Sequence, residues 1–370
     1  MKIVCSKSNL LYGVNIVSKA VPSRTTMAIL ECILIDASTN EIKLTANDTE
    51  LGIETKIEGE ILNRGIIALD AKVFSEMVRK LPDNEVTIET DDSFKTVITC
   101  EKSKFNIIGK SGEDFSYLPY IERNQPIILS QFTLKEVIRQ TIFSISDNDS
   151  NKVMTGEYFE ITENQLRVVS LDGHRISIRK IGLKEVYENR KAIVPGKTLQ
   201  EVSKILPGDT EDLVHMFFTD NHIIFEFGNT TVVSRLIEGD YFKIDQMLSS
   251  DYDTKFTINR RELLDCIDRA TLLIKEGDKK PIIMNITDET MELKINSFIG
   301  SMNEEIDIHK EGNDILIGFN PKFFIDALRV IDDEEVCLYM VNPKAPCFIK
   351  DSDETYIYLI LPVNFNAASN

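Results

Sequence analysis

Apolar residues recur at helical spacing in three segments of the chain, and a short β-branched run leads into each segment. The segments are residues 67–82, 193–207 and 317–331. Apolar positions three and four residues apart predict a helix with one buried face. Lys72, Lys197 and Lys322 hold the same place in each segment and follow one another at intervals of 125 residues. This regular interval predicts three copies of one structural unit.

Each predicted unit also contains an earlier helix and several strands. The earlier helices centre on Leu10 and Val14, on Leu134 and Ile138, and on Leu263 and Ile267. In the first unit, residues 86–89, 97–100 and 105–108 alternate between apolar and polar positions, with turn residues between them. Such alternation predicts antiparallel hairpins. We therefore expect an α+β fold of three repeated domains, each with two helices packed on antiparallel sheet.

Short polar stretches at residues 123–126 and 249–251 mark the limits of the three units. The domains are therefore expected at residues 1–123, 124–250 and 251–366, packed in a fixed arrangement because no low-complexity linker separates them. The length agrees with several domains. A chain of 370 residues exceeds the roughly 250 to 300 residues at which a single hydrophobic core stops growing.

The composition, 42% hydrophobic and 28% charged, is that of a soluble globular protein. No apolar run approaches the roughly 18 residues that a membrane span requires, and the first residues lack the apolar core of a signal peptide. The six cysteines lie far apart without a C-x-x-C pair, so we expect reduced and mostly buried thiols. These features predict a cytoplasmic protein.

The net charge of −18 argues at first against nucleic-acid binding, because DNA-binding domains usually carry a basic balance. The objection fails only if the basic residues gather on one surface. Each repeated helix carries two basic residues seven positions apart, and seven residues at 3.6 per turn return to nearly the same face. The pairs are Lys72 and Arg79, Lys197 and Lys204, and Lys322 and Arg329.

One such pair would mean little in a chain with 42 basic residues, because helix surfaces commonly carry lysines. Its recurrence in all three copies favours a shared surface that faces a polyanion, since phosphate contacts need only positive charge at the right distance. Lys135 and Arg139 on the earlier helix of the second unit extend this candidate surface. Arg24 is a further candidate in a loop. We call these nine residues the basic set.

Signatures of catalysis and metal binding are missing from the sequence. The four histidines and the scattered cysteines show no metal-ligand spacing, and no common hydrolase or dinucleotide motif occurs. Gly196, Lys197 and Thr198 resemble the end of a phosphate-binding loop, but Lys191 stands where that loop needs glycine. No catalytic residue, cofactor or metal site is predicted. The alternatives are a nucleotide-hydrolysing enzyme that uses Lys197 and Thr198, and a repeat-built scaffold that binds only proteins.

Several short segments resemble, in order and spacing, the bacterial DNA polymerase III β subunit, the sliding clamp family. They are Met1–Ile3 with Leu10 and Leu11, Val168–Ser177, Val194–Lys197, Gly318–Lys322 and Tyr358–Val363, and together they span residues 1 to 365. The resemblance implies a non-catalytic processivity factor. It further implies a head-to-tail homodimer that forms a closed ring around duplex DNA, with helices lining the hole. Its partners would be the polymerase catalytic subunit, the clamp loader and other proteins with clamp-binding motifs.

A geometric estimate agrees with two chains in the ring. Six helices about 10 Å apart enclose a hole only about 9 Å wide, which is too narrow for duplex DNA. Twelve helices enclose a hole of about 28 Å, which is wider than a duplex of about 20 Å, and the same estimate is compatible with three chains. A mildly basic hole inside an acidic exterior would also reconcile the net charge with sliding on DNA.

The resemblance further implies two protein-binding surfaces. The partner-peptide cleft would be formed by Met154, Leu171, Gly173, His174, Arg175, Ile176, Met247, Pro346, Ile360, Leu361, Pro362 and Val363. The dimer interface would bring Phe105 and Ile107 against Leu272 and Leu273. The chain departs from the family pattern at residues 241–244, Tyr-Phe-Lys-Ile, and at Asn364, and both departures affect the expected cleft.

Overall fold

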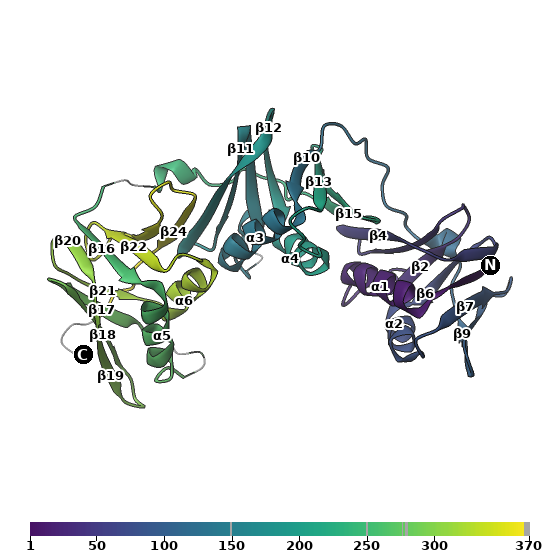
Figure 1. The fold of residues 1–370 in the computed structure, drawn as a ribbon, viewed down its shortest axis with the longest axis horizontal. Helices are drawn as coiled ribbons and strands as arrows, with labels where there is room; N and C mark the ends of the chain where they lie inside the picture. Colours follow the sequence, from purple (N-terminus) through teal and green to yellow (C-terminus); the bar gives the residue numbers. More distant parts are fainter. Residues whose placement is uncertain (149, 249–250, 276, 278–279, 366–370) are drawn as a thin grey trace. The chain divides into compact units, whose positions relative to one another are not determined.

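The computed structural model describes residues 1–148, 150–248, 251–275, 277 and 280–365 (Figure 1). The chain forms two compact units, Met1–Leu134 with Lys197–Leu236, and Lys135–Gly196 with Ile237–Asn370. The predicted limit near residue 250 falls at Ser249 and Ser250, outside the described residues. Each unit combines parts of more than one repeat, because continuous sheets cross the limits between repeats.

The first unit contains two antiparallel sheets. The five-stranded sheet has the order β5 (Glu60–Asn63), β1 (Lys2–Ser6), β7 (Glu85–Thr90), β8 (Lys95–Cys100) and β9 (Ser103–Ile108). The eight-stranded sheet has the order β10 (Ile127–Ser130), β13 (Leu213–Phe218), β14 (His222–Phe227), β15 (Thr230–Arg235), β4 (Leu51–Ile57), β3 (Ile42–Asn47), β2 (Cys32–Asp36) and β6 (Ile66–Asp70).

The second unit also contains two antiparallel sheets. The seven-stranded sheet has the order β11 (Gly156–Leu171), β12 (Arg175–Pro195), β24 (Tyr356–Ile360), β23 (Cys347–Lys350), β22 (Glu335–Met340), β16 (Thr254–Asn259) and β20 (His309–Gly312). The four-stranded sheet has the order β19 (Ser301–Asp307), β18 (Thr290–Asn296), β17 (Ile282–Thr287) and β21 (Ile315–Phe319).

The described α-helices coincide with the six expected from the sequence. They are α1 (Lys7–Val17), α2 (Ala71–Lys80), α3 (Gln131–Thr141), α4 (Gly196–Ile205), α5 (Arg260–Thr271) and α6 (Pro321–Val330). α1 packs against α2, and α5 packs against α6 (Figure 1). The longest of them has 12 residues, which is short of the roughly 20 that a transmembrane helix needs. No helix within the described ranges could span a membrane.

Local sequence explains where these helices begin and which face they bury. The Asp70 side chain caps α2 by accepting a hydrogen bond of 2.8 Å from the Val73 backbone amide, and Asn320 caps α6 before a proline at its first turn. The buried face of α2 carries Phe74 and Val78. Burying each such side chain contributes about 1.5 to 3 kcal/mol. The charged residues of the helix, Lys72, Glu76, Arg79 and Lys80, are exposed to solvent.

One sheet junction occurs twice in the chain. β15, the last strand of the second repeat, pairs with β4 of the first repeat, with Thr230 opposite Thr55. In the same way β24, the last strand of the third repeat, pairs with β12 of the second, with Arg175 opposite Ile360. The corresponding last strand of the first repeat, β9, is the edge of its sheet within the described residues. In the third repeat, β19 corresponds to β4. Within the described residues, β19 is an edge strand of the four-stranded sheet.

Glu157 is a buried acid whose charge no basic side chain within the described residues compensates. Glu157 on β11 is fully buried, and neither carboxylate oxygen has a hydrogen-bond partner among the described residues. Burial raises the pKa of Glu157 to about 8, because removing a charged carboxylate from water is unfavourable. The side chain is therefore protonated in the folded chain at neutral pH.

This raised pKa makes the stability of the fold depend on pH. The unfolded state releases the proton above its ordinary pKa near 4.5 while the folded state retains it, so stability falls as pH rises from about 4.5 to about 8. Glu157→Gln should remove this dependence and raise the free energy of unfolding at pH 7 by up to about 3 kcal/mol. Thermal unfolding between pH 5 and 8 checks it, with the exposed Glu188→Gln as control. Parallel pH profiles in both variants would contradict the assignment.

Candidate functional site

The six basic residues that recur seven positions apart on the repeated helices are all exposed. They lie on α2 (Lys72, Arg79), α4 (Lys197, Lys204) and α6 (Lys322, Arg329). Each helix turns its apolar residues into a core, so the two basic side chains of a helix point away from that core. The repeated pattern in the sequence thus becomes a repeated exposed basic stripe.

The six residues differ in their ionic partners. Lys197 contacts Asp48 at 2.5 Å, Lys204 contacts Glu201 at 2.8 Å, and Arg329 contacts Asp268 at 3.4 Å. The other three residues have no acidic partner within 4.0 Å in the part of the chain that the structure describes; they are Lys72, Arg79 and Lys322. Half of the stripe charge is therefore already compensated inside the protein.

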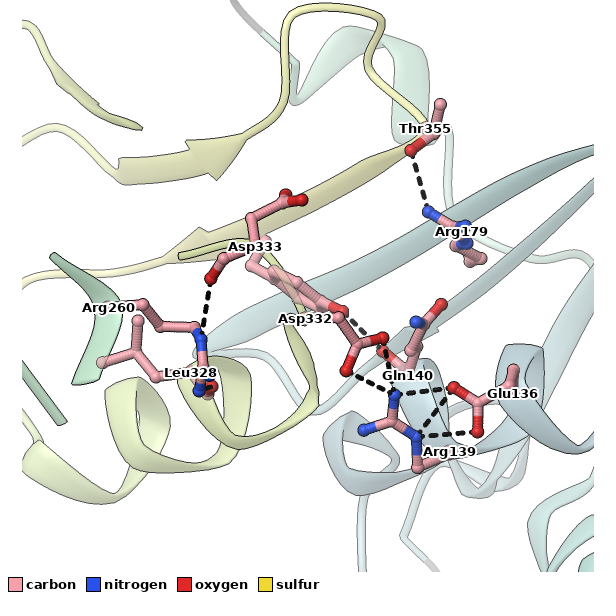
Figure 2. Close-up of polar contacts among 10 residues, drawn as sticks. Glu136, Arg139, Gln140, Arg179, Arg260, Leu328, Asp332, Asp333 and Thr355 are labelled. Atoms are coloured by element: carbon pink, nitrogen blue, oxygen red, sulfur yellow. Dashed lines mark hydrogen bonds and ion pairs between the residues drawn. The ribbon is translucent and has the colours of Figure 1, made fainter. Parts of the chain in front are cut away.

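The other three members of the basic set also differ. Arg24 is exposed in the segment before Leu30, and Lys135 is half-buried. Arg139 is only partly exposed and is held by two carboxylates, Glu136 at 2.6 Å and Asp332 at 3.2 Å (Figure 2). These contacts raise the pKa of its guanidinium. Arg139 therefore links α3 to the segment after α6 rather than standing free on the helix surface.

The phosphate-loop alternative does not fit the local geometry. The Thr198 hydroxyl is buried and lies 2.6 Å from the Ser234 hydroxyl, while the Lys197 ammonium is bound to Asp48. Both groups that a nucleotide phosphate or its metal ion would need are thus engaged elsewhere. No group of three or more potential metal ligands occurs among the residues the structure describes.

A cavity of about 350 Å³ lies in the second unit, and its lining is mostly apolar. The lining residues are Met154, Leu171, Gly173, His174, Arg175, Ile176, Phe242, Met247, Pro346, Leu359 and Leu361. Nine of them are among the twelve expected in the partner-peptide cleft. The sequence reasoning missed Phe242 and Leu359.

The three remaining cleft candidates do not line the cavity. Ile360 is buried in the core below α5 and α6, because successive residues of a strand point to opposite faces and its neighbours Leu359 and Leu361 face the cavity. Pro362 and Val363 lie beyond the cavity, and the Val363 amide donates to the Gly318 carbonyl at 2.9 Å. Strand alternation was the signal that could have separated Ile360 from Leu361.

The turn between β11 and β12 gives the cavity one rigid wall. The Asp172 carboxylate accepts hydrogen bonds from the backbone amides of His174 at 2.9 Å and Arg175 at 3.2 Å. Gly173 has φ of 88°, a conformation that side-chain-bearing residues rarely adopt. The Leu361 amide donates to the His174 carbonyl at 2.9 Å, which joins the two walls.

Arg175 lines this cavity but is not free to bind an anion. Its side chain is 7% exposed and contacts Asp172 at 3.0 Å and Asp326 at 2.6 Å. Its guanidinium also lies 4.7 Å from the ring centre of Phe323 on α6. The charge is therefore neutralised by two carboxylates, and the side chain anchors the cavity wall to α6. Apolar contacts are left as the main means of recognition in the cavity.

The four expected interface residues lie on β9 and in the two positions after α5. Phe105 and Ile107 on β9 are half-buried, and Leu273 is half-buried against the core of the second unit. Leu272 is 77% exposed. The sequence reasoning missed three exposed neighbours, Ile108 at 80%, Phe298 at 95% and Ile299 at 52%. The exposure of Ile108 could not be judged from the sequence, because apolar residues in strands are usually core residues. Phe298 and Ile299 lie in the turn between β18 and β19.

Comparisons with known proteins agree on one family. Models of the N-terminal, central and C-terminal domains of the DNA polymerase III beta subunit match residues 1–119, 128–243 and 245–364. The beta sliding clamp of Staphylococcus aureus is 36% identical over 374 residues, covering 98% of this chain and 99% of the relative.

Solved structures give the same result. The crystal structure of the DNA polymerase sliding clamp from Bacillus subtilis is 34% identical, with a TM-score of 0.96 and coverage of 99% of this chain and 100% of that one. A protein described as a DNA polymerase III beta subunit, from Eubacterium rectale ATCC 33656, is 79% identical, with a TM-score of 0.97 and the same coverage. The chain therefore belongs to the DNA polymerase III beta-subunit family, the sliding clamps.

Proposed function

We propose that two copies of this sliding clamp close head to tail into a ring around duplex DNA. The ring would hold the polymerase and other replication or repair proteins on the DNA through the cavity at Leu361. The clamp is a non-catalytic processivity factor, as its family is. The proposal includes three domains at 1–123, 124–250 and 251–366 and a cytoplasmic location, where replication proteins of bacteria work.

The repeated sheet junction is the observation that carries the proposal. The junctions β15 with β4 and β24 with β12 join each repeat to the one before it. Their counterpart would join β9 to β19, but both are sheet edges in the described structure. An open edge presents unpaired amides and carbonyls and is usually covered. A second copy satisfies both edges if β9 of each chain pairs with β19 of the other.

Apolar side chains at these margins support the same pairing. Ile108 is exposed at β9, while Leu272 and Phe298 are exposed near the end of α5 and in the turn before β19. A contact between two different surfaces yields a closed ring when the rotation closes and a filament when it does not. Closure after two copies gives twelve helices, enough to surround a duplex at the usual spacing between helices.

The exposed basic stripes support helices α2, α4 and α6 as the lining of the hole. A net charge of −18 per chain leaves the rest of the surface strongly acidic, so phosphate attraction is confined to the stripes. Contacts with the DNA backbone alone carry no sequence information. The ring would therefore bind any duplex weakly and slide along it, as a processivity factor requires.

A charge reversal tests the lining. Changing Lys72, Arg79 and Lys322 to Glu should lower the direct affinity for a short duplex roughly tenfold or more at low salt, because six attractive groups per dimer become repulsive. A control variant carries the same change at three exposed lysines on strands and loops, Lys184, Lys243 and Lys344. Fluorescence anisotropy of a labelled duplex measures both. Equal losses in the two variants would place the DNA elsewhere.

A further inference from the structure

The basic stripes of the three helices differ in how many of their residues have a carboxylate partner. Both stripe residues of α4 have a carboxylate partner, whereas neither stripe residue of α2, Lys72 or Arg79, has one among the described residues. On α6, Arg329 is paired with Asp268 on α5, and Lys322 has no such partner in the described ranges. The sequence pattern treats all six positions alike, so this gradation comes from the acids that the fold brings to them.

Asp48 is the most firmly held of these acids. Its side chain is 8% exposed, in the turn between β3 and β4. One carboxylate oxygen accepts hydrogen bonds from the amides of Glu50 at 3.0 Å and Leu51 at 2.7 Å. The other oxygen binds Lys197. The carboxylate therefore cannot rotate away to free the lysine without breaking the turn that holds it.

Glu201 is the corresponding acid for Lys204 and lies about one turn before it on α4. Its side chain is 17% exposed, although it lies on a helix surface. Arg139 contacts the half-buried Glu136 and the exposed Asp332, as Figure 2 shows. Asp268 differs, because it is 46% exposed and contacts Arg329 only at 3.4 Å. An exposed pair of this kind is weak and easily exchanged.

These ion pairs reduce the free energy that a DNA phosphate gains by binding the paired lysine. A phosphate that takes an unpaired lysine displaces condensed cations from the DNA, and this release drives binding. A phosphate that binds Lys197 breaks the ion pair between Lys197 and the nearly buried Asp48. The Asp48 carboxylate must then bind a cation from solution or stay without a counterion. The net ion release is then smaller, and the contact adds less to affinity.

We propose that Asp48 and Glu201 are built-in counterions that hold the two lysines of α4 back from DNA and so keep direct affinity low enough for sliding. The inference rests on the proposed function, because it assumes that α4 faces the duplex. It assigns the strongest phosphate contacts to α2 and the weakest to α4.

The test is the salt dependence of duplex binding by the full-length dimer. Asp48→Asn keeps the side-chain oxygen that accepts the turn's hydrogen bonds but removes the charge, and Glu201→Gln acts on a helix surface with no role in a turn. The double variant should bind a labelled duplex several-fold more tightly. The slope of log affinity against log salt should steepen by up to about 0.9 for each of four freed lysines per dimer. Glu201→Gln alone should give half of that change.

Matched controls separate this effect from net charge. Glu185→Gln with Glu188→Gln, two exposed positions on β12, removes the same charge and should leave the slope unchanged. Lys197→Gln should weaken binding little in the wild type and clearly more in the Asp48→Asn background. Equal losses in both backgrounds, or an unchanged slope in the double variant, overturn the inference.

The proposed function has a separate control. Lys72→Gln removes an unpaired lysine and should make the wild-type slope shallower by about 1.8 per dimer, at about 0.9 for each lysine. If Lys72→Gln changes nothing, the helices do not face DNA and the lining itself is wrong. If Lys72→Gln acts as expected and the double variant does not, only the counterion role fails.

Discussion

Leu272→Asp is expected to convert the clamp from a dimer into monomers. The side chain is 77% exposed in a single chain, and the proposed ring buries it against the partner. Replacing the buried leucine by a carboxylate costs about 3 kcal/mol at one interface. The ring has two identical interfaces, so the cost occurs twice. The combined cost of about 6 kcal/mol raises the dissociation constant roughly 10⁴-fold. Sedimentation velocity at micromolar concentration measures the change.

The choice of Leu272 avoids damage to the fold. Leu273→Asp should also break the dimer, but Leu273 packs against the core of the second unit and its loss would lower folding stability as well. Leu316→Asp is the matched control. Leu316 is 40% exposed on β21, which is the edge opposite β19 in the four-stranded sheet. The control should remain dimeric. A dimer that survives both Leu272→Asp and Ile108→Asp would place the interface on another surface.

Leu361→Asp is expected to lower the affinity for polymerase-derived peptides strongly. Leu361 lines the cavity together with Leu171 and Met247, and a few buried apolar contacts usually carry most of the energy of such an interface. A loss of about 2 to 3 kcal/mol corresponds to roughly 30- to 150-fold weaker binding. Isothermal titration with the free peptide measures it. The dimer should be unaffected, because Leu361 belongs to neither β9 nor β19.

A point substitution and its control separate the cavity from the fold. Deleting Leu361 to Val363 should remove peptide binding too, but it also removes the two backbone hydrogen bonds that tie this segment to His174 and Gly318. Val186→Asp supplies the control, because Val186 is 76% exposed on β12 and does not line the cavity. Peptide binding that persists in Leu361→Asp, at the affinity of the control, would move the site away from this cavity.

The helices could be predicted from the sequence, and most of the strand pairing could not. The segments around Phe74 and Phe324 have strong helical periodicity and a capping residue before them, so local signals sufficed. β11 and β12 form a hairpin of 16 and 21 residues, far longer than the usual strand. Its register is irregular near Glu163, and distant partners such as β24 stabilise it. Local patterns carry no such information.

Some features of the candidate sites could likewise be predicted from local sequence, and others depend on the fold. Exposure of Lys72 and Arg79 followed from helical spacing alone. The partner of Lys197 did not, because Asp48 lies 149 residues earlier and reaches it only through the pairing of β4 with β15. Phe242, which lines the cavity, stands in the stretch where the chain departs from the family pattern. A side chain at such a departure can be placed only by the fold.

Retention on DNA of different topology tests the central claim, a closed ring around duplex DNA, most directly. The clamp is loaded by a clamp loader onto a nicked circular duplex, washed at high salt, and the bound fraction is measured before and after the circle is linearised. Topology rather than charge holds a ring, so the clamp should survive the wash on the circle and be lost from the linear duplex with free ends. Equal retention on circular and linear DNA would contradict the ring, whatever the basic stripes do.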